Sequence, residues 1–147
     1  MAWAKNGTPD TLGSAADQLN ITDLTENKFI FILQHTLAAV GNTFGKFNTG
    51  SGSIDTGSNY AKRENDNGGS DNTGTSIGYM TFAKGSGQAW DVFGVGHISN
   101  LSGKEKLLIA NGCDTGGTGA GNIGNRREAA CKWENTANHI DTIGKYM

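Results

Sequence analysis

The chain has 147 residues, enough for one domain with a modest hydrophobic core and too few for two. Its net charge is −2, and its basic residues form no stripe beyond the pairs Lys62–Arg63 and Arg126–Arg127, which argues against nucleic acid as a partner. Glycine is abundant, at 23 residues against one proline, as is typical of a chain that turns often.

No targeting or membrane segment is evident. The opening MAWAKNGTPD has no apolar stretch of signal-peptide length. The longest apolar run, Phe29–Leu33, is far too short to cross a bilayer. We therefore expect no membrane partner. We expect the chain either to be cytoplasmic or to reach the outside by a route other than secretion, such as cell lysis.

The N-terminal segment 1–13 shows no convincing strand alternation, and we interpret it as an arm ahead of one domain over residues 14–147. Trp3 and Leu12 are its main apolar anchors, so we expect them to contact a neighbouring subunit or the body of the protein.

The first two strands are expected at 17–22 and 27–39. In the second, Phe29, Phe31 and Leu33 alternate with Ile30 and Ile32, so both faces of its first half are apolar. Such a pattern predicts a central strand beneath a second layer.

Further strands follow at roughly regular spacing. The segment 60–64 is polar and is predicted to be a sheet edge. Gly94 and Gly96, within an expected strand, predict a bend or a close backbone approach. The segment 127–133 fits a strand or a helix, and we favour a strand because the other elements are strands. The full set of later strands is 44–48, 60–64, 75–84, 89–98, 106–110, 127–133 and 139–143. Eight or nine strands predict an all-β, single-domain antiparallel β-sandwich of the jelly-roll or concanavalin-like kind.

Two polar loops, 51–59 and 65–74, could bind a ligand. Asp55, Asp66, Asn67 and Asp71 offer oxygen atoms of the kind that calcium prefers, but the terminal Glu of a helix-flanked calcium loop is missing. A solvated turn is therefore the favoured interpretation, and we expect no metal and no cofactor.

Other motifs carry little chemistry. Gly119–Gly124 matches the dinucleotide-binding pattern, yet too few residues follow for the helix and strand that such a site requires. Cys113 and Cys131 are more easily explained as two free thiols than as a disulfide or a metal site. A glycosidase needs two carboxylates across a cleft, and few carboxylates lie within the expected strands. We expect no enzyme.

Several segments, taken in order, resemble a known group of proteins. They are Trp3–Leu12, Ile21–Phe31, Tyr60–Arg63 before a Gly-rich turn, Ile98–Leu107, and Gly119–Gly121 leading to Asn125–Arg126 and Lys132–Trp133. This series is similar to small proteins common in the genomes of marine tailed phages. The resemblance implies a jelly-roll or laminin-G-like β-sandwich and a place in the virion, on the capsid surface or the tail, after assembly in the host cytoplasm. It implies no catalytic residues.

The favoured hypothesis is therefore a non-enzymatic structural protein of the phage particle, such as a capsid decoration protein, with capsid or tail proteins as partners. The alternative is a carbohydrate-binding module, with or without calcium, that recognises a host-surface glycan. We also expect a homo-oligomer, a trimer on phage precedent. Its contact is predicted at a C-terminal sheet edge formed by 139–143, with Ile140 and Ile143 in the interface.

Overall fold

The computed structural model describes residues 18–25, 28–37, 43–48, 53–83 and 91–146, and within these ranges the chain forms strands and no helix. The all-β prediction is therefore confirmed. The strands are β1 (Gln18–Ile21), β2 (Phe29–Leu37), β3 (Thr43–Asn48), β4 (Tyr60–Asp66), β5 (Asn72–Ile77), β6 (Met80–Ala83), β7 (Asp91–Ser99), β8 (Lys106–Asp114), β9 (Arg126–Trp133) and β10 (Thr142–Tyr146).

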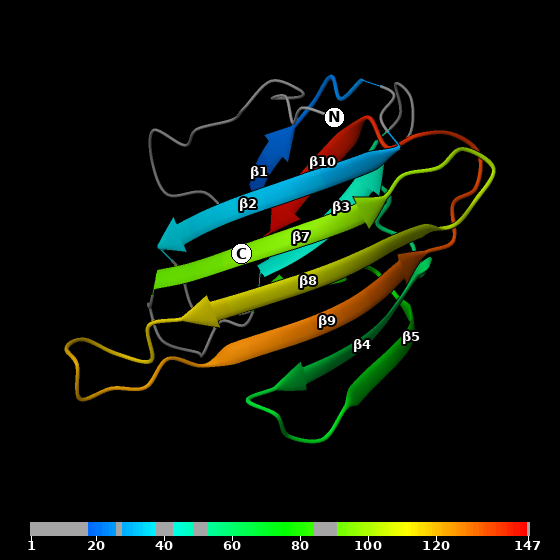
Figure 1. The fold of residues 1–147 in the computed structure, drawn as a ribbon. Helices are drawn as coiled ribbons and strands as arrows, with labels where there is room; N and C mark the ends of the chain where they lie inside the picture. The colour runs from blue at the N-terminus through cyan, green and yellow to red at the C-terminus, as the bar shows by residue number, and fades with distance from the viewer. Residues whose placement is uncertain (1–17, 26–27, 38–42, 49–52, 84–90, 147) are drawn as a thin grey trace.

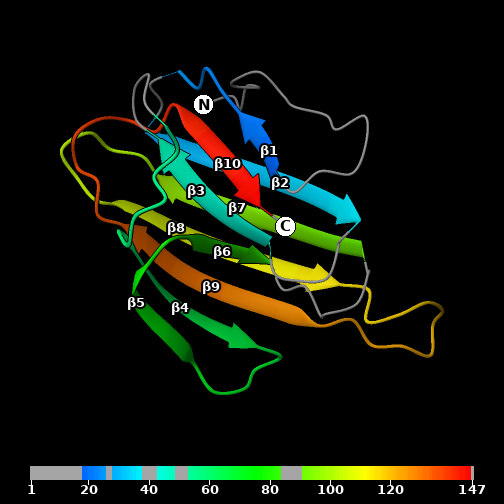
Figure 2. The ribbon, with the colours of Figure 1, turned by 180° about the vertical axis from the view of Figure 1, so that it is seen from behind.

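The strands form two antiparallel sheets that pack face to face. One sheet has the order β2-β7-β8-β9-β4-β5 and faces the viewer in Figure 1, while the other has the order β1-β10-β3-β6 and lies in front in Figure 2. This arrangement confirms the predicted single-domain β-sandwich.

The core between the sheets centres on three aromatic rings. The indole of Trp133 is stacked on the ring of Tyr60, with centroids 5.9 Å apart and an interplanar angle of 11°, and its centroid is 5.7 Å from that of Phe47. Each ring comes from a different strand, so these contacts join β9 and β4 to β3 of the second sheet. Aromatic pairs of this kind add about 0.5–1.5 kcal/mol to the effect of burial alone.

Glycines allow the short strand β6 to lie close against the larger sheet. A Cβ atom at Gly112 would lie 2.4 Å from the Cβ of Ala83, and one at Gly96 would lie 3.1 Å from the ring of Phe82. A close approach, one of the two possibilities expected at Gly96, is therefore found there, and the side chains of Phe82 and Leu108 make it.

The strand predicted at 75–84 is divided between the two sheets. Ser76 has a φ of 53°, a left-handed conformation that interrupts an extended chain. β5 ends one residue later, and the chain passes through Gly78 into β6 of the other sheet.

Three predictions about sheet edges are wrong. Within the described part of the chain, β2 is not central but forms one edge of the six-stranded sheet. β4 is not an edge, because β5 folds back along it through a turn with positive φ at Asn67 and Gly68. The C-terminal strand is not an edge either, since β10 lies between β1 and β3.

The polar sequence of β4 has a different cause from an edge position. Glu64 is buried and accepts a hydrogen bond from Lys62 Nζ at 2.7 Å, while Arg127 Nη1 lies 3.3 Å from its second oxygen. The guanidinium of Arg127 also donates two hydrogen bonds to Asp66, at 2.7 and 2.9 Å. Lys62, Glu64 and Asp66 of β4 thus form one cluster of paired charges with Arg127, whereas Arg63 of the same strand is exposed.

Candidate functional site

The outer face of the six-stranded sheet carries exposed apolar side chains on three neighbouring strands. Of the seven large hydrophobic side chains exposed in the described part of the chain, six lie on this face: Phe29, Phe31 and Leu33 of β2, Phe93 of β7, and Leu107 and Ile109 of β8. We call these six residues the apolar face. Alternate residues of β7 and β8 point inward and are buried, so the sheet is apolar on both sides here.

The strand register places these side chains side by side. Phe31 is opposite His97, and His97 is opposite Ile109, so the three form one row across β2, β7 and β8. The rings of Phe31 and His97 have centroids 4.9 Å apart. In a second row, Leu33 is opposite Val95. The apolar face is therefore continuous across three strands rather than a set of scattered exposures.

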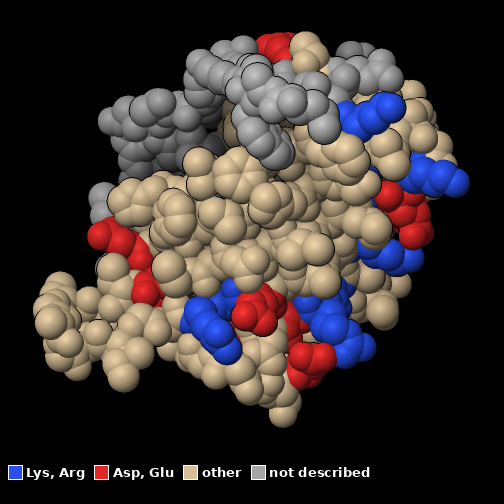
Figure 3. All heavy atoms as spheres, viewed as in Figure 1, with Lys and Arg blue, Asp and Glu red and all other residues tan. Residues whose placement is uncertain are grey.

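On the β8 side of the apolar face, charged residues on or next to β9 and β4 are paired with one another. Lys132 Nζ lies 3.1 Å from Glu105, Arg126 lies 3.7 Å from Glu128, and Arg63 lies 2.5 Å from Asp71. Figure 3 shows a broad uncharged area in the middle of this side of the molecule, with blue and red side chains below it. Because each of these ion pairs contains one positive and one negative side chain, they impose no strong charge preference on a partner.

A contiguous exposed apolar area of this kind usually marks a surface that binds another molecule, since single exposed hydrophobic residues are normal but clusters are not. The sequence carried a signal for it. The runs Phe29–Leu33 and Leu107–Ile109 are apolar on both faces, and an outer layer would be needed to cover both. The first run predicts a covered central strand and the second a short strand at 106–110, and neither pattern indicates which of its two faces stays exposed.

The predicted interface residues are not on this surface. Ile140 is 0% exposed and Ile143 is 3% exposed, and both belong to the hydrophobic core. Ile143 pairs with Ile21 and Phe47 on the two strands that flank β10, so its side chain is covered within the same subunit. The prediction that these two residues form an intersubunit contact is therefore wrong. Trp3 and Leu12 lie outside the described residues.

The predicted ligand loop is not brought together as one site. Asp66 is bound by Arg127, and Asp71 by Arg63. Asn67 forms part of a turn in which its side-chain oxygen accepts a hydrogen bond from the backbone N–H of Arg126 at 2.8 Å. Asp55 belongs to a separate hollow. Among the described residues, no group of three or more His, Cys, Asp or Glu side chains could hold a metal ion.

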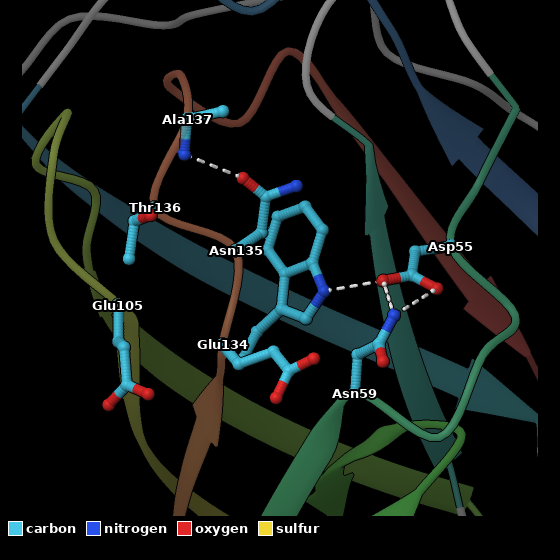
Figure 4. Close-up of a pocket in the computed structure, with 8 residues that line it drawn as sticks. Asp55, Asn59, Glu105, Glu134, Asn135, Thr136 and Ala137 are labelled. Carbon is cyan, nitrogen blue, oxygen red and sulfur yellow. Dashed lines mark hydrogen bonds between the residues drawn. The ribbon is translucent and has the colours of Figure 1, made fainter.

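Asp55 lines a polar hollow of about 520 Å³ at one end of the sandwich, shown in Figure 4. The other lining residues are Asn59, Glu105, Trp133, Glu134, Asn135, Thr136 and Ala137. Trp133 Nε1 donates a 2.7 Å hydrogen bond to Asp55, and Asn59 Nδ2 donates to the same carboxylate. Glu105 is held by Lys132. Two of the three carboxylates here are thus engaged in structural contacts.

The electrostatics of Asp55 suit an anchor rather than a proton donor. Burial raises its pKa, but hydrogen bonds from Asn59, Trp133 and Gly57 outweigh that effect, and the net result is a lowered pKa. A general acid needs the opposite shift, because it must hold its proton near neutral pH. The Trp133 indole is only 1% exposed and is covered by Tyr60, so it offers no surface for a sugar ring.

The two cysteines are free and lie on opposite faces of the six-stranded sheet. Cys113 is exposed on the outer face, while Cys131 is buried, and burial raises the pKa of the Cys131 thiol to about 11. The interpretation as two unpaired thiols is confirmed.

The glycine-rich segment that matches a dinucleotide motif forms the loop between β8 and β9, which projects from the body in Figure 1. Its base is held by Asp114, whose carboxylate accepts hydrogen bonds from the backbone N–H groups of Gly116 at 2.8 Å and Asn125 at 3.0 Å. Near its end lies Ile123, 91% exposed and the seventh of the exposed hydrophobic side chains. The loop has neither the helix nor the strand of a nucleotide site.

Comparisons with protein-family models, with curated proteins and with solved structures gave no match. The described residues include no helix of the length and apolar character needed to cross a membrane. The function is therefore inferred from the exposed apolar face and from the resemblance of the sequence segments.

Proposed function

We propose that this protein is a non-enzymatic structural protein that docks through its apolar face, and that it does so as a component of a tailed-phage particle, on the capsid surface or the tail. The observation that carries the first part is the continuous exposed apolar surface on β2, β7 and β8. The second part is supported by the resemblance of the sequence segments to marine tailed-phage proteins.

The size and chemistry of the surface favour a protein partner. Protein interfaces combine an apolar centre with a polar rim, and the apolar face has such a rim in its charge pairs. Exposed phenylalanine rings in a wide sheet face provide contact area, whereas they provide no hydrogen bonds for a small polar ligand.

The carbohydrate-binding alternative would place a glycan in the polar hollow beside Glu134 and Asn135. Sugar recognition usually adds an aromatic ring on which the sugar stacks, and the ring available there, Trp133, is buried. We therefore rank this alternative second, and a glycan array with the purified protein tests it directly.

Charge substitutions on one row of the sheet test the docking surface. Ile109 and Thr73 lie in the same row on the same face, three strands apart, which corresponds to about 14 Å. We expect Ile109→Lys to abolish incorporation into phage particles, because an ammonium group would be buried at the contact. Thr73→Lys adds the same charge outside the apolar face and should leave incorporation unchanged.

The measurement is the amount of each variant in gradient-purified particles from infected cells, relative to the wild type. Circular dichroism of the purified variants checks that each retains its strands. If the wild type is absent from particles, the virion assignment is wrong. If Ile109→Lys is incorporated as well as Thr73→Lys, the docking surface is wrong.

A further inference from the structure

Among the described residues β2 is an edge strand, and it lacks the features by which proteins usually prevent edge pairing. It runs for nine residues, FIFILQHTL, without a Lys, Arg, Asp, Glu or Pro. Its nine residue pairs with β7 show no register shift, so no bulge interrupts the strand. A long, regular and apolar edge of this kind is a template for pairing with another chain.

The other sheet edges do carry such features. β1 and β6 have four residues each, and the pairing of β6 with β3 is irregular at Thr43 and Phe44. β5 is polar, its pairing with β4 is interrupted near Tyr60, and Ser76 has a positive φ. β2 is thus the exception among the four edges of the two sheets.

The sequence of β2 is suited to antiparallel pairing with itself. Leu33 is the central residue of the strand, so a two-fold axis there places Leu33 opposite Leu33 and Phe29 opposite Leu37 of a second copy. No formal charge lies on the paired strands. Asp91 pairs with Leu37 at one end of β2. The same axis brings the exposed Lys28 of one copy to that end of the other copy, so that two opposite charges approach each other and attract.

We propose that two copies of this chain, in place of the trimer expected on phage precedent, join edge to edge through β2 about a two-fold axis at Leu33, and that the joined sheets present their apolar faces as one surface. The proposal deepens the proposed function and rests on it, because the doubled surface would be the one that docks on the particle. Backbone hydrogen bonds would supply the contact, which leaves Phe93 and Ile109 of both copies exposed for the particle.

Cysteine cross-linking tests the register. In a Cys113→Ser background, Leu33→Cys would place two thiols directly opposite each other, with Cα atoms about 4.5–5.5 Å apart, a distance that suits a disulfide. Phe29→Cys would place its two thiols about 26 Å apart. Leu107→Cys is exposed to a similar degree as Leu33 but lies two strands from the edge, so it reports random collisions.

We expect mild oxidation to convert most of Leu33→Cys into a covalent dimer at micromolar concentration, at least ten times faster than Phe29→Cys or Leu107→Cys. Sedimentation of the unmodified protein should show a dimer, and Leu33→Lys should be a monomer. Equal rates for all three cysteine variants, faster cross-linking at Leu107, or a wild-type monomer at every concentration would each overturn edge pairing.

The two proposals fail in different ways. Ile109→Lys should remain a dimer in sedimentation while it is lost from particles. If the protein is a dimer through Leu33 but never enters particles, the edge contact stands and the virion role does not.

Discussion

Leu108 and Ile109 are consecutive in β8 and lie on opposite faces of the sheet, 1% and 61% exposed respectively. Leu108 points into the sandwich, whereas Ile109 lies in the middle of the apolar face. Two adjacent residues of nearly equal hydrophobicity thus have different physical roles.

Truncation of these two residues should therefore have very different effects on stability. Leu108→Ala removes buried atoms and leaves a cavity, so we expect the free energy of unfolding to fall by about 2–5 kcal/mol. Ile109→Ser removes an exposed side chain and should change it by about 0.5 kcal/mol or less. Urea denaturation measures both, and a large loss for Ile109→Ser would show that the apolar face is covered in the isolated protein.

The thiols should react at very different rates with a thiol reagent such as DTNB. Cys113 is exposed and should react in the native protein, whereas burial raises the pKa of Cys131 to about 11 and removes it from solvent. We expect one equivalent to react at pH 8 in buffer and two in denaturant. Cys113→Ser should abolish the native reaction; fast native labelling of that variant would contradict the burial of Cys131.

Asp55 should make the fold sensitive to acid. Its folded pKa lies below the ordinary value of 3.8, so its stabilising effect is fully present above pH 3.8 and is lost as the pH falls through the folded pKa. Asp55→Asn should lower stability at pH 7 by about 1–2 kcal/mol, because the amide loses the negative charge and one of the two oxygens that accept from Trp133, Asn59 and Gly57. It should also reduce the loss of stability at low pH. Asp71→Asn, at an exposed ion pair, is the control and should cost about 1 kcal/mol or less. Denaturation midpoints between pH 2 and 7 make the comparison, and equal losses for the two variants would argue against an anchoring role.

Lys145 should make the protein more stable as the pH rises above neutrality. Burial lowers its pKa to about 8 from 10.5, and within the described residues its Nζ has no hydrogen-bond partner. The unfolded chain therefore binds more protons than the folded one between pH 8 and 10.5, and stability rises through that window. Lys145→Met should raise stability at pH 7 by about 1 kcal/mol and should remove this pH dependence. The gain is small because Lys145 is only partly shielded from solvent. Thermal unfolding of both proteins from pH 7 to 10.5 measures the effect, and parallel profiles would contradict it.

The spacing of apolar residues and turn residues was enough to predict an all-β sandwich and the position of nearly every strand. Period-two alternation and glycine-rich turns are local properties, and the chain folds according to them in β7, β8 and β9. The ambiguous segment 127–133 became a strand because β8 and β4 pair with it on both sides.

The order of the strands within each sheet could not be predicted from the local sequence. The polar strand β4 resembled an edge in its sequence, and the burial of its charges depends on Arg127, which lies 63 residues after Glu64 in the chain. The C-terminal residues resembled a free edge for the same reason, because nothing local indicates that β1 and β3 enclose β10.

By itself, the sequence determined which residues alternate, where the chain turns, and that the stretch Phe29–Leu33 is apolar on both faces. Only the tertiary structure decided which face of each strand is covered. Pairing of strands distant in sequence puts Ile30 under the second sheet and leaves Phe29 and Leu33 outside. Local pattern therefore indicated the strands of the candidate site but not the site itself, because the site consists of those apolar residues that the second layer does not reach.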